Sequence, residues 1–141
     1  MTTGNEAALA KWWDDFWSKG DLSVAKEIFD PEFQDHDPNV PGLPSGIEGI
    51  KQKNVFYRQV MPDLTVTVER EIDTGDYAAV HWRAVGTHKG EIFGVGGTGN
   101  NIELEGISYI RMKNGRLAEQ WIHYDALGML AQLGVLSDPR G

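Results

Sequence analysis

The end of the chain brings a carboxyl group, an imidazole and an indole onto one face of a predicted strand. Alternation along residues 116–125 places four side chains on that face: Glu119, Trp121, His123 and Asp125. If Trp121 faces the interior, desolvation raises the pKa of the Asp125 carboxyl group toward neutral. Such a group can accept and return a proton near neutral pH, so Asp125 is a candidate acid or base. Two alternatives remain open: the face is solvated, or Asp125 only caps a helix that starts at Ala126.

A second candidate is His88, near the end of an earlier alternating segment. One face of that segment carries Trp82, Ala84, Gly86 and His88. The small residues between Trp82 and His88 leave room for a ligand. From this position the His88 imidazole could donate a hydrogen bond to a carbonyl or enolate oxygen. The alternative is that His88 is a surface imidazole at a turn.

A third candidate is His36, which stands between two carboxylates in Asp35-His36-Asp37. A neighbouring carboxylate favours the imidazolium form. Three consecutive residues rarely chelate one ion, and the chain has no His-x-His or His-Glu-x-x-His pattern, so we predict no metal site. We expect His36 to lie at the mouth of a pocket or on the surface.

Other patterns exclude whole classes of chemistry. The chain has no cysteine, so thiolate catalysis and disulfides are ruled out. The glycine-rich stretch 94–99 lacks the Lys and Ser or Thr of a phosphate-binding loop, which argues against a nucleotide. Trp12, Trp13 and Trp17 recur at helical spacing, and they are either core residues or a platform for a ligand.

Charge and hydropathy further limit the classes of partner that the protein can have. The 141 residues carry a formal net charge of −8, and the Lys and Arg residues are scattered, so we predict no nucleic-acid partner. No apolar run approaches the length that spans a bilayer, and residues 1–6 lack the features of a signal peptide. We therefore predict a cytoplasmic protein that does not insert into membranes.

Periodicity indicates the elements that position these side chains. Helical spacing predicts four helices, at residues 7–17, 22–29, 47–61 and 126–134. Alternation predicts four strands in a meander, at residues 64–72, 77–88, 102–112 and 116–125. The segment 33–49 is rich in Pro and Gly and is predicted to be a loop. Together these elements predict one α+β domain over residues 1–141, with N-terminal helices packed on a curved antiparallel sheet around an apolar pocket.

Several short motifs follow one another along the chain: His36-Asp37-Pro38, Pro41-Gly42, Gly46-Ile47-Glu48-Gly49-Ile50-Lys51, Met61-Pro62-Asp63-Leu64, Gly86-Thr87-His88-Lys89-Gly90, Thr98-Gly99 and Trp121-Ile122-His123-Tyr124-Asp125. In this combination they resemble one known family, the SnoaL-like polyketide cyclases. The resemblance extends from about Asp21 to Gly134. The chain departs from the family pattern at Gly96-Gly97, where prolines are frequent, and in its additional imidazoles His81 and His123.

The resemblance implies a cone-shaped fold of the nuclear transport factor 2-like superfamily. It also implies an enzyme that closes a polyketide ring by intramolecular aldol condensation, without metal or cofactor. By motif position Asp125 is the proton shuttle and His88 its helper. The small apolar or aromatic carbonyl substrate is then expected to contact His36, Trp121, His123, Trp82, Tyr57 and Trp17.

Other functions within the same fold remain open. A module that only binds small molecules would use Trp17, Tyr57, Trp82 and Trp121. The superfamily also contains hydratases, isomerases and proteins associated with hydroxylation. Alternating apolar residues on both sides of the last strands suggest that the outer face of the sheet is covered too. We predict a homodimer through a face that carries Ile107, Tyr109, Ile122 and Tyr124.

Overall fold

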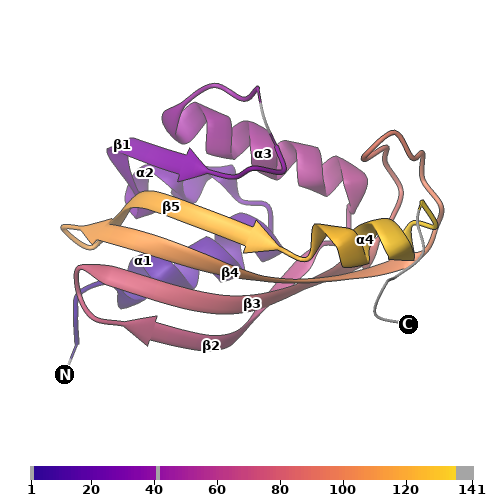
Figure 1. Ribbon diagram of the computed structural model, residues 1–141. Coiled ribbons are helices and arrows are strands. Elements are labelled where there is room, and N and C mark those ends of the chain that lie inside the picture. The colour runs from indigo at the N-terminus through magenta and orange to yellow at the C-terminus, as the bar shows by residue number, and fades with distance from the viewer. Residues whose placement is uncertain (1, 41, 136–141) are drawn as a thin grey trace.

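The computed structural model describes residues 2–40 and 42–135, in which all helices but the last pack against one face of a five-stranded sheet (Figure 1). The helices are α1 (Glu6–Lys11), the π-helix η1 (Trp12–Ser18), the 3₁₀-helix η2 (Leu22–Val24), α2 (Ala25–Ile28), α3 (Gly46–Val60) and α4 (Ala126–Gln132). The strands are β1 (Phe29–His36), β2 (Thr65–Asp73), β3 (Tyr77–Thr87), β4 (Asn101–Lys113) and β5 (Arg116–Tyr124). This arrangement confirms the predicted α+β class.

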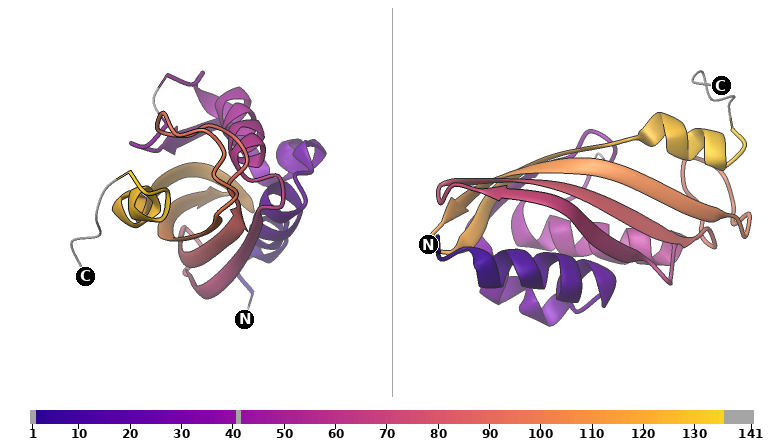
Figure 2. Two further views of the ribbon diagram at one scale, coloured as in Figure 1. Left: turned by 90° about the vertical axis from the view of Figure 1, so that its right-hand side faces the viewer. Right: turned by 90° about the horizontal axis from the view of Figure 1, so that it is seen from below.

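The sheet is open and has the strand order β1-β5-β4-β3-β2. Strands β2 to β5 form the predicted antiparallel meander, and their ends lie within a residue or two of the predicted ones. The turn between β4 and β5 contains Asn114 and Gly115, both with positive φ (53° and 73°). A tight hairpin requires these angles, and Asn-Gly adopts them readily. The sheet curves around the helices, which leaves a concave inner face (Figure 2).

The predicted single helix at residues 7–17 is two elements, because α1 continues as the π-helix η1 from Trp12. Trp12 and Phe16 are fully buried, and both pack against Phe29. Trp13 and Trp17 are buried on another side of η1, where they contact Trp82 and Tyr57 respectively. The helix η1 therefore serves both the core and the inner face of the sheet.

Strand β1 is absent from the sequence-based prediction, which has helix and loop at its residues. It runs parallel to β5, with Asp35 opposite Gln120 and His36 opposite Trp121. Its sequence does not alternate in hydrophobicity, since only Phe29 and Phe33 are buried. Pro31 is tolerated because β1 is an edge strand. The prediction of a loop from residue 33 is therefore wrong for residues 33–36.

Helix α4 protects the edge of β4 beyond the end of β5. It lies on the opposite side of the sheet from α1 and α3 (Figure 2). The Gln132 amide accepts from the backbone N–H of Glu103 and donates to its carbonyl, both at 2.8 Å. These two bonds replace the ladder that another strand would provide, so this stretch of edge is not left unpaired.

Within residues 2–40 and 42–135, no helix has the length and apolar character needed to cross a membrane.

Candidate functional site

A cavity lies between the concave face of the sheet and the helices. Its empty volume is about 490 Å³, counting the space open to solvent at its mouth. The aliphatic part of its wall consists of Met61, Leu64, Val66, Ala84, Leu104 and Ile122. The sequence predicts a single apolar pocket enclosed by the sheet and the helices, and this cavity occupies that position.

Five aromatic side chains also line the cavity, and we refer to them as the aromatic belt: Trp13, Trp17, Tyr57, Tyr124 and Trp82. Ring centroids lie 6.5 Å apart for Trp17–Tyr57, 6.4 Å for Tyr57–Tyr124, 6.5 Å for Tyr124–Trp82 and 6.4 Å for Trp82–Trp13. The belt closes along η1, which carries both Trp13 and Trp17.

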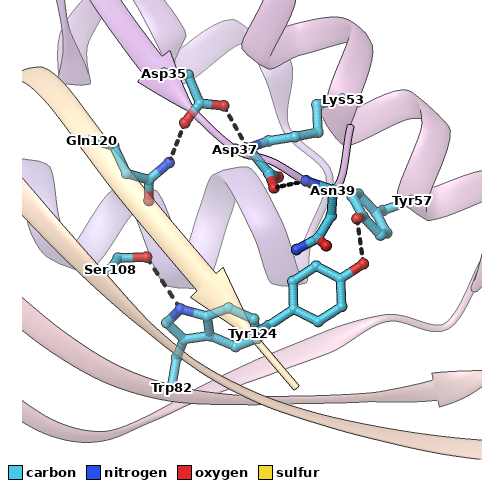
Figure 3. A network of polar contacts seen from close by, with 9 residues as sticks. All are labelled: Asp35, Asp37, Asn39, Lys53, Tyr57, Trp82, Ser108, Gln120 and Tyr124. Atoms are coloured by element: carbon cyan, nitrogen blue, oxygen red, sulfur yellow. Dashed lines mark hydrogen bonds and ion pairs between the residues drawn. The ribbon is translucent and has the colours of Figure 1, made fainter. Parts of the chain in front are cut away.

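Gly106 explains how the Trp82 indole fits against the sheet. A Cβ atom at Gly106 would lie 2.4 Å from the indole ring, so no larger residue leaves this space. The indole nitrogen of the same side chain, Trp82 Nε1–H, donates to Ser108 Oγ at 3.1 Å (Figure 3). This bond satisfies the indole N–H within the sheet.

The polar part of the wall is an ion-paired cluster in which Lys53 lies between two carboxylates (Figure 3). Lys53 Nζ donates to Asp35 Oδ2 at 2.5 Å and to Asp37 Oδ2 at 3.2 Å. The side chains of Lys53 and Asp37 are only 2% and 5% exposed, and both line the cavity. Gln120 Nε2 donates to Asp35 Oδ1 at 2.8 Å, and the Asn39 N–H donates to Asp37 Oδ1 at 2.9 Å.

The two tyrosines of the belt present hydroxyl groups to the same cavity. Their oxygens lie 3.0 Å apart, so one hydroxyl donates to the other (Figure 3). Burial raises the pKa of Tyr57 far above its usual range, and the nearby Tyr124, Asp37 and Asp35 raise it further. Burial also raises the pKa of Tyr124. Both hydroxyls stay protonated at neutral pH. The bond between them uses one of the two hydroxyl hydrogens, so the other can be donated to a ligand oxygen.

Three of the predicted substrate contacts lie on the cavity wall: Trp17, Tyr57 and Trp82. They come from η1, α3 and β3, and the fold brings them together as members of the belt. Their contact with a substrate stays a prediction.

The other three predicted contacts, His36, Trp121 and His123, are not among the cavity-lining residues. Alternation along β5 is as predicted, but the prediction that Trp121 faces the interior is wrong. Gln120, Ile122 and Tyr124 occupy the inner face instead. On the outside, the His36 ring stacks on Trp121 with centroids 5.2 Å apart, and His36 Nε2 lies 2.6 Å from Glu119 Oε2.

Asp125 is the N-cap of α4, where its Oδ1 accepts from the Gly128 N–H at 2.9 Å. The residue is exposed and borders a surface hollow that also contains His81 and Glu105. The alternative that Asp125 caps a helix starting at Ala126 is therefore confirmed, and the desolvated position expected for an acid or base is not found. Its chemical role stays a prediction.

His88 is fully buried, which contradicts the surface alternative. Its Nδ1 accepts from the Thr98 N–H at 3.2 Å, and its Nε2 has no hydrogen-bond partner among the described residues. His88 does not line the cavity. It lies beyond Gly86, over which Met61 packs so closely that a Cβ on Gly86 would approach Met61 Cβ to 2.8 Å.

Sequence reasoning missed three groups at the polar part of the cavity: Asp37, Lys53 and the Tyr124 hydroxyl. A signal for Lys53 exists, because it falls on the buried stripe of α3 with Ile50 and Tyr57. Asp37 lies in the Asp35-His36-Asp37 segment, in which His36 was the predicted functional residue. In the described part of the chain, no group of three His, Asp or Glu side chains is placed to hold a metal ion.

The chain matches one protein family and is similar to several solved structures. The family model for SnoaL-like polyketide cyclase matches residues 7–133. IdmH from Streptomyces antibioticus, whose name carries the description putative polyketide cyclase, is 33% identical with a TM-score of 0.80, over 93% of this chain and 99% of that one. A protein described in the same words from Acidithiobacillus ferrooxidans is 26% identical with a TM-score of 0.83, over 94% and 95%.

TsrD from Streptomyces laurentii is 24% identical with a TM-score of 0.86, over 96% of this chain and 98% of that one, and this likeness shows the shared fold. No curated protein gives a significant match. The family match covers most of the chain, and the α+β architecture agrees with the cone-shaped fold expected from the motifs. The chain therefore belongs to the family of SnoaL-like polyketide cyclases.

Proposed function

We propose that this protein is a cofactor-independent acid/base catalyst that closes a ring in a small polyketide-like carbonyl compound by an intramolecular aldol reaction. One observation carries the proposal: the Asp37 carboxylate lies on the wall of an apolar cavity that also holds two protonated tyrosine hydroxyls. Family membership supports the reaction class.

The proton balance of the reaction needs only Asp37. Its carboxylate takes an α-proton from the substrate, and the C–H electron pair becomes the enolate. The enolate carbon attacks a second carbonyl carbon of the same molecule, which forms the C–C bond and an alkoxide. The Asp37 carboxyl group returns its proton to the alkoxide, so the enzyme ends unchanged.

The neighbouring side chains assist these steps. The Tyr57–Tyr124 pair donates a hydrogen bond to the enolate oxygen, where negative charge develops. Lys53 fixes the direction of the Asp37 carboxylate through its ion pair. The belt holds a flexible substrate in the geometry that cyclises, a contribution worth up to several kcal/mol.

Asp125 is the competing assignment for the base, on the strength of its motif position. Exchange of substrate α-protons in deuterated water, followed by NMR over a panel of β-keto esters and aromatic ketones, separates the two. We expect the native protein and Asp125→Asn to catalyse exchange, and Asp37→Asn to lose it. Asn remains a good N-cap at residue 125 and keeps an oxygen acceptor at residue 37, so both variants preserve local structure.

Exchange that survives in Asp37→Asn and disappears in Asp125→Asn would return the role of base to Asp125. No exchange by the native protein, with compounds that demonstrably bind, would overturn the acid/base proposal. That outcome would favour a module that only binds small molecules, for which the aromatic belt is the supporting feature.

A further inference from the structure

We infer that the same cavity binds organic cations, namely quaternary or protonated tertiary amines of a size that the aromatic belt can surround. This inference goes beyond the proposed function, because it concerns a charged ligand class and requires no proton transfer. It rests on the geometry of the belt and on the charges behind it.

The belt surrounds the cavity with ring surface. Its members come from four elements of the fold: η1, α3, β3 and β5. Consecutive rings are inclined to each other by 71° for Trp17–Tyr57, 83° for Tyr57–Tyr124, 50° for Tyr124–Trp82 and 31° for Trp82–Trp13. None of these pairs is stacked face to face, so the rings do not cover one another's faces.

The polar edges of the belt are partly tied up within the protein. The Trp82 N–H is bonded to Ser108, and the Tyr57 and Tyr124 hydroxyls are bonded to each other. The wall of the cavity therefore presents mainly carbon, aromatic from the belt and aliphatic from the residues between its members. The negative face of an aromatic ring attracts a cation within about 6 Å of the ring centre, and the attraction is strongest where water is excluded.

The charges next to the belt add to this attraction. Asp35 and Asp37 carry two formal negative charges and Lys53 one positive charge, so the cluster has a formal charge of −1. Among the described residues that line the cavity, Lys53 is the only cationic one, and it is already held by both carboxylates. The upward shift in the pKa of Tyr57, caused first by burial, includes contributions from Asp37 and Asp35, which indicates a negative field at the belt.

A net negative field discriminates between ligands of the same shape. An anion is repelled and also loses its hydration. A neutral ligand gains only from the burial of its apolar surface. A cation with methyl groups around its charge gains from the burial, from the rings and from the field, and its hydration is weak enough to give up.

Matched ligands provide the test. Benzyltrimethylammonium and neopentylbenzene have the same shape and differ in charge, and phenylacetate supplies an anion. Binding is measured by calorimetry and by quenching of tryptophan fluorescence. We expect the cation to bind at least about tenfold more tightly than its neutral isostere, with no detectable binding of phenylacetate.

Variants locate the site. Asp37→Asn is expected to reduce the preference for the cation severalfold while the neutral isostere binds as before. Glu119→Gln removes the same charge from the outer face and is expected to leave the preference unchanged. Trp82→Leu is expected to weaken the binding of the cation. Trp121→Leu, on the outer face, is the control and is expected to leave this binding unchanged.

Equal or tighter binding of neopentylbenzene by the native protein would overturn the inference, and this comparison requires no variant to fold. The inference and the proposed function fail separately. If the native protein shows no preference for the cation but catalyses α-proton exchange that depends on Asp37, only the cation site is refuted. Cation binding without any α-proton exchange would refute only the catalytic proposal.

Discussion

Tyr57 and Tyr124 reach the same point of the cavity from opposite layers of the fold, one from helix α3 and the other from strand β5. Their hydroxyl oxygens lie 3.0 Å apart although 67 residues separate them in the sequence. Burial raises the pKa of both, so both hydroxyls stay neutral, and the hydrogen that their mutual bond does not use can be donated to a ligand. The pair is therefore the feature of the site whose removal is easiest to interpret.

Substitution of Tyr124 by Phe removes one hydroxyl and keeps the ring in the belt. In the proposed mechanism the enolate oxygen then loses either Tyr124 itself as its donor or the hydrogen bond by which Tyr124 polarises the Tyr57 hydroxyl. We expect the rate of α-proton exchange to fall, by up to about a hundredfold. NMR exchange rates at saturating substrate are the measurement. Tyr109→Phe is the control, because Tyr109 lies exposed on the outer face. A rate that is unchanged in Tyr124→Phe would remove the tyrosine pair from the mechanism.

Substitution of Lys53 by Met leaves the carboxylates of Asp35 and Asp37 side by side without their cation. We expect the free energy of unfolding, measured with urea at pH 7, to fall by about 3 kcal/mol. Adding Asp35→Asn and Asp37→Asn to this variant should recover much of the loss, because no charge is then left unpaired.

The comparison for Lys53 is Lys11→Met, which breaks the exposed Lys11–Glu27 ion pair. This change should cost less than about 1 kcal/mol. Equal losses in Lys53→Met and Lys11→Met would show that the buried cluster makes no special contribution to stability.

Asp63, in the Met-Pro-Asp-Leu motif, gives a prediction for pH dependence. Its carboxylate accepts from the Thr87 N–H at 2.7 Å and from the Thr87 hydroxyl at 2.8 Å, and these bonds lower its pKa below the ordinary 3.8. Because the pKa is lower in the folded state, the contribution to stability is present above pH 3.8 and disappears as the pH falls through the folded pKa.

Urea unfolding of the native protein and Asp63→Asn between pH 7 and the acid limit tests this dependence. The difference in free energy of unfolding should be constant near neutral pH and shrink in strongly acidic solution. Asp14→Asn, which removes an exposed carboxylate elsewhere on the surface, serves as the control. A difference that does not change with pH would contradict the assigned cause.

The predicted homodimer remains a proposal, with its contact face corrected. Ile107 and Tyr109 are exposed on the outer face, whereas Ile122 and Tyr124 point inward. An outer row of rings adds to that face: Tyr77 stacks on Tyr109 at 5.3 Å, and Tyr109 contacts Trp121 at 5.6 Å. A second copy of the chain that covers this row would bury the exposed rings.

Substitution of Ile107 by Glu is expected to shift the protein from dimer to monomer in light scattering at micromolar concentration. A charge buried against the partner's apolar surface would lack compensation. Val55→Glu, on the exposed side of α3, should leave the oligomeric state unchanged. A native protein that is already monomeric at this concentration would refute the dimer.

The sequence by itself determined the elements whose pattern is local. Alternation identified β2 to β5 and the side chains that share a face, and helical spacing identified α3 and α4. The Asn114-Gly115 turn was predictable because only a few residue pairs adopt positive φ readily. Short motifs identified the family, since they combine such local requirements in a fixed order.

Only the tertiary structure decided which face of β5 is the inner one and which residues meet at the cavity. The alternation of side chains along β5 is the same whether Trp121 or Tyr124 faces inward. Which of the two faces is buried depends on where the helices pack on the sheet. Strand β1 forms through its pairing with β5, and the Asp35–Gln120 bond joins residues 85 positions apart. Local periodicity does not indicate which distant segment a strand will pair with. The cluster around Lys53 therefore could not be predicted from the sequence and is defined by the tertiary structure.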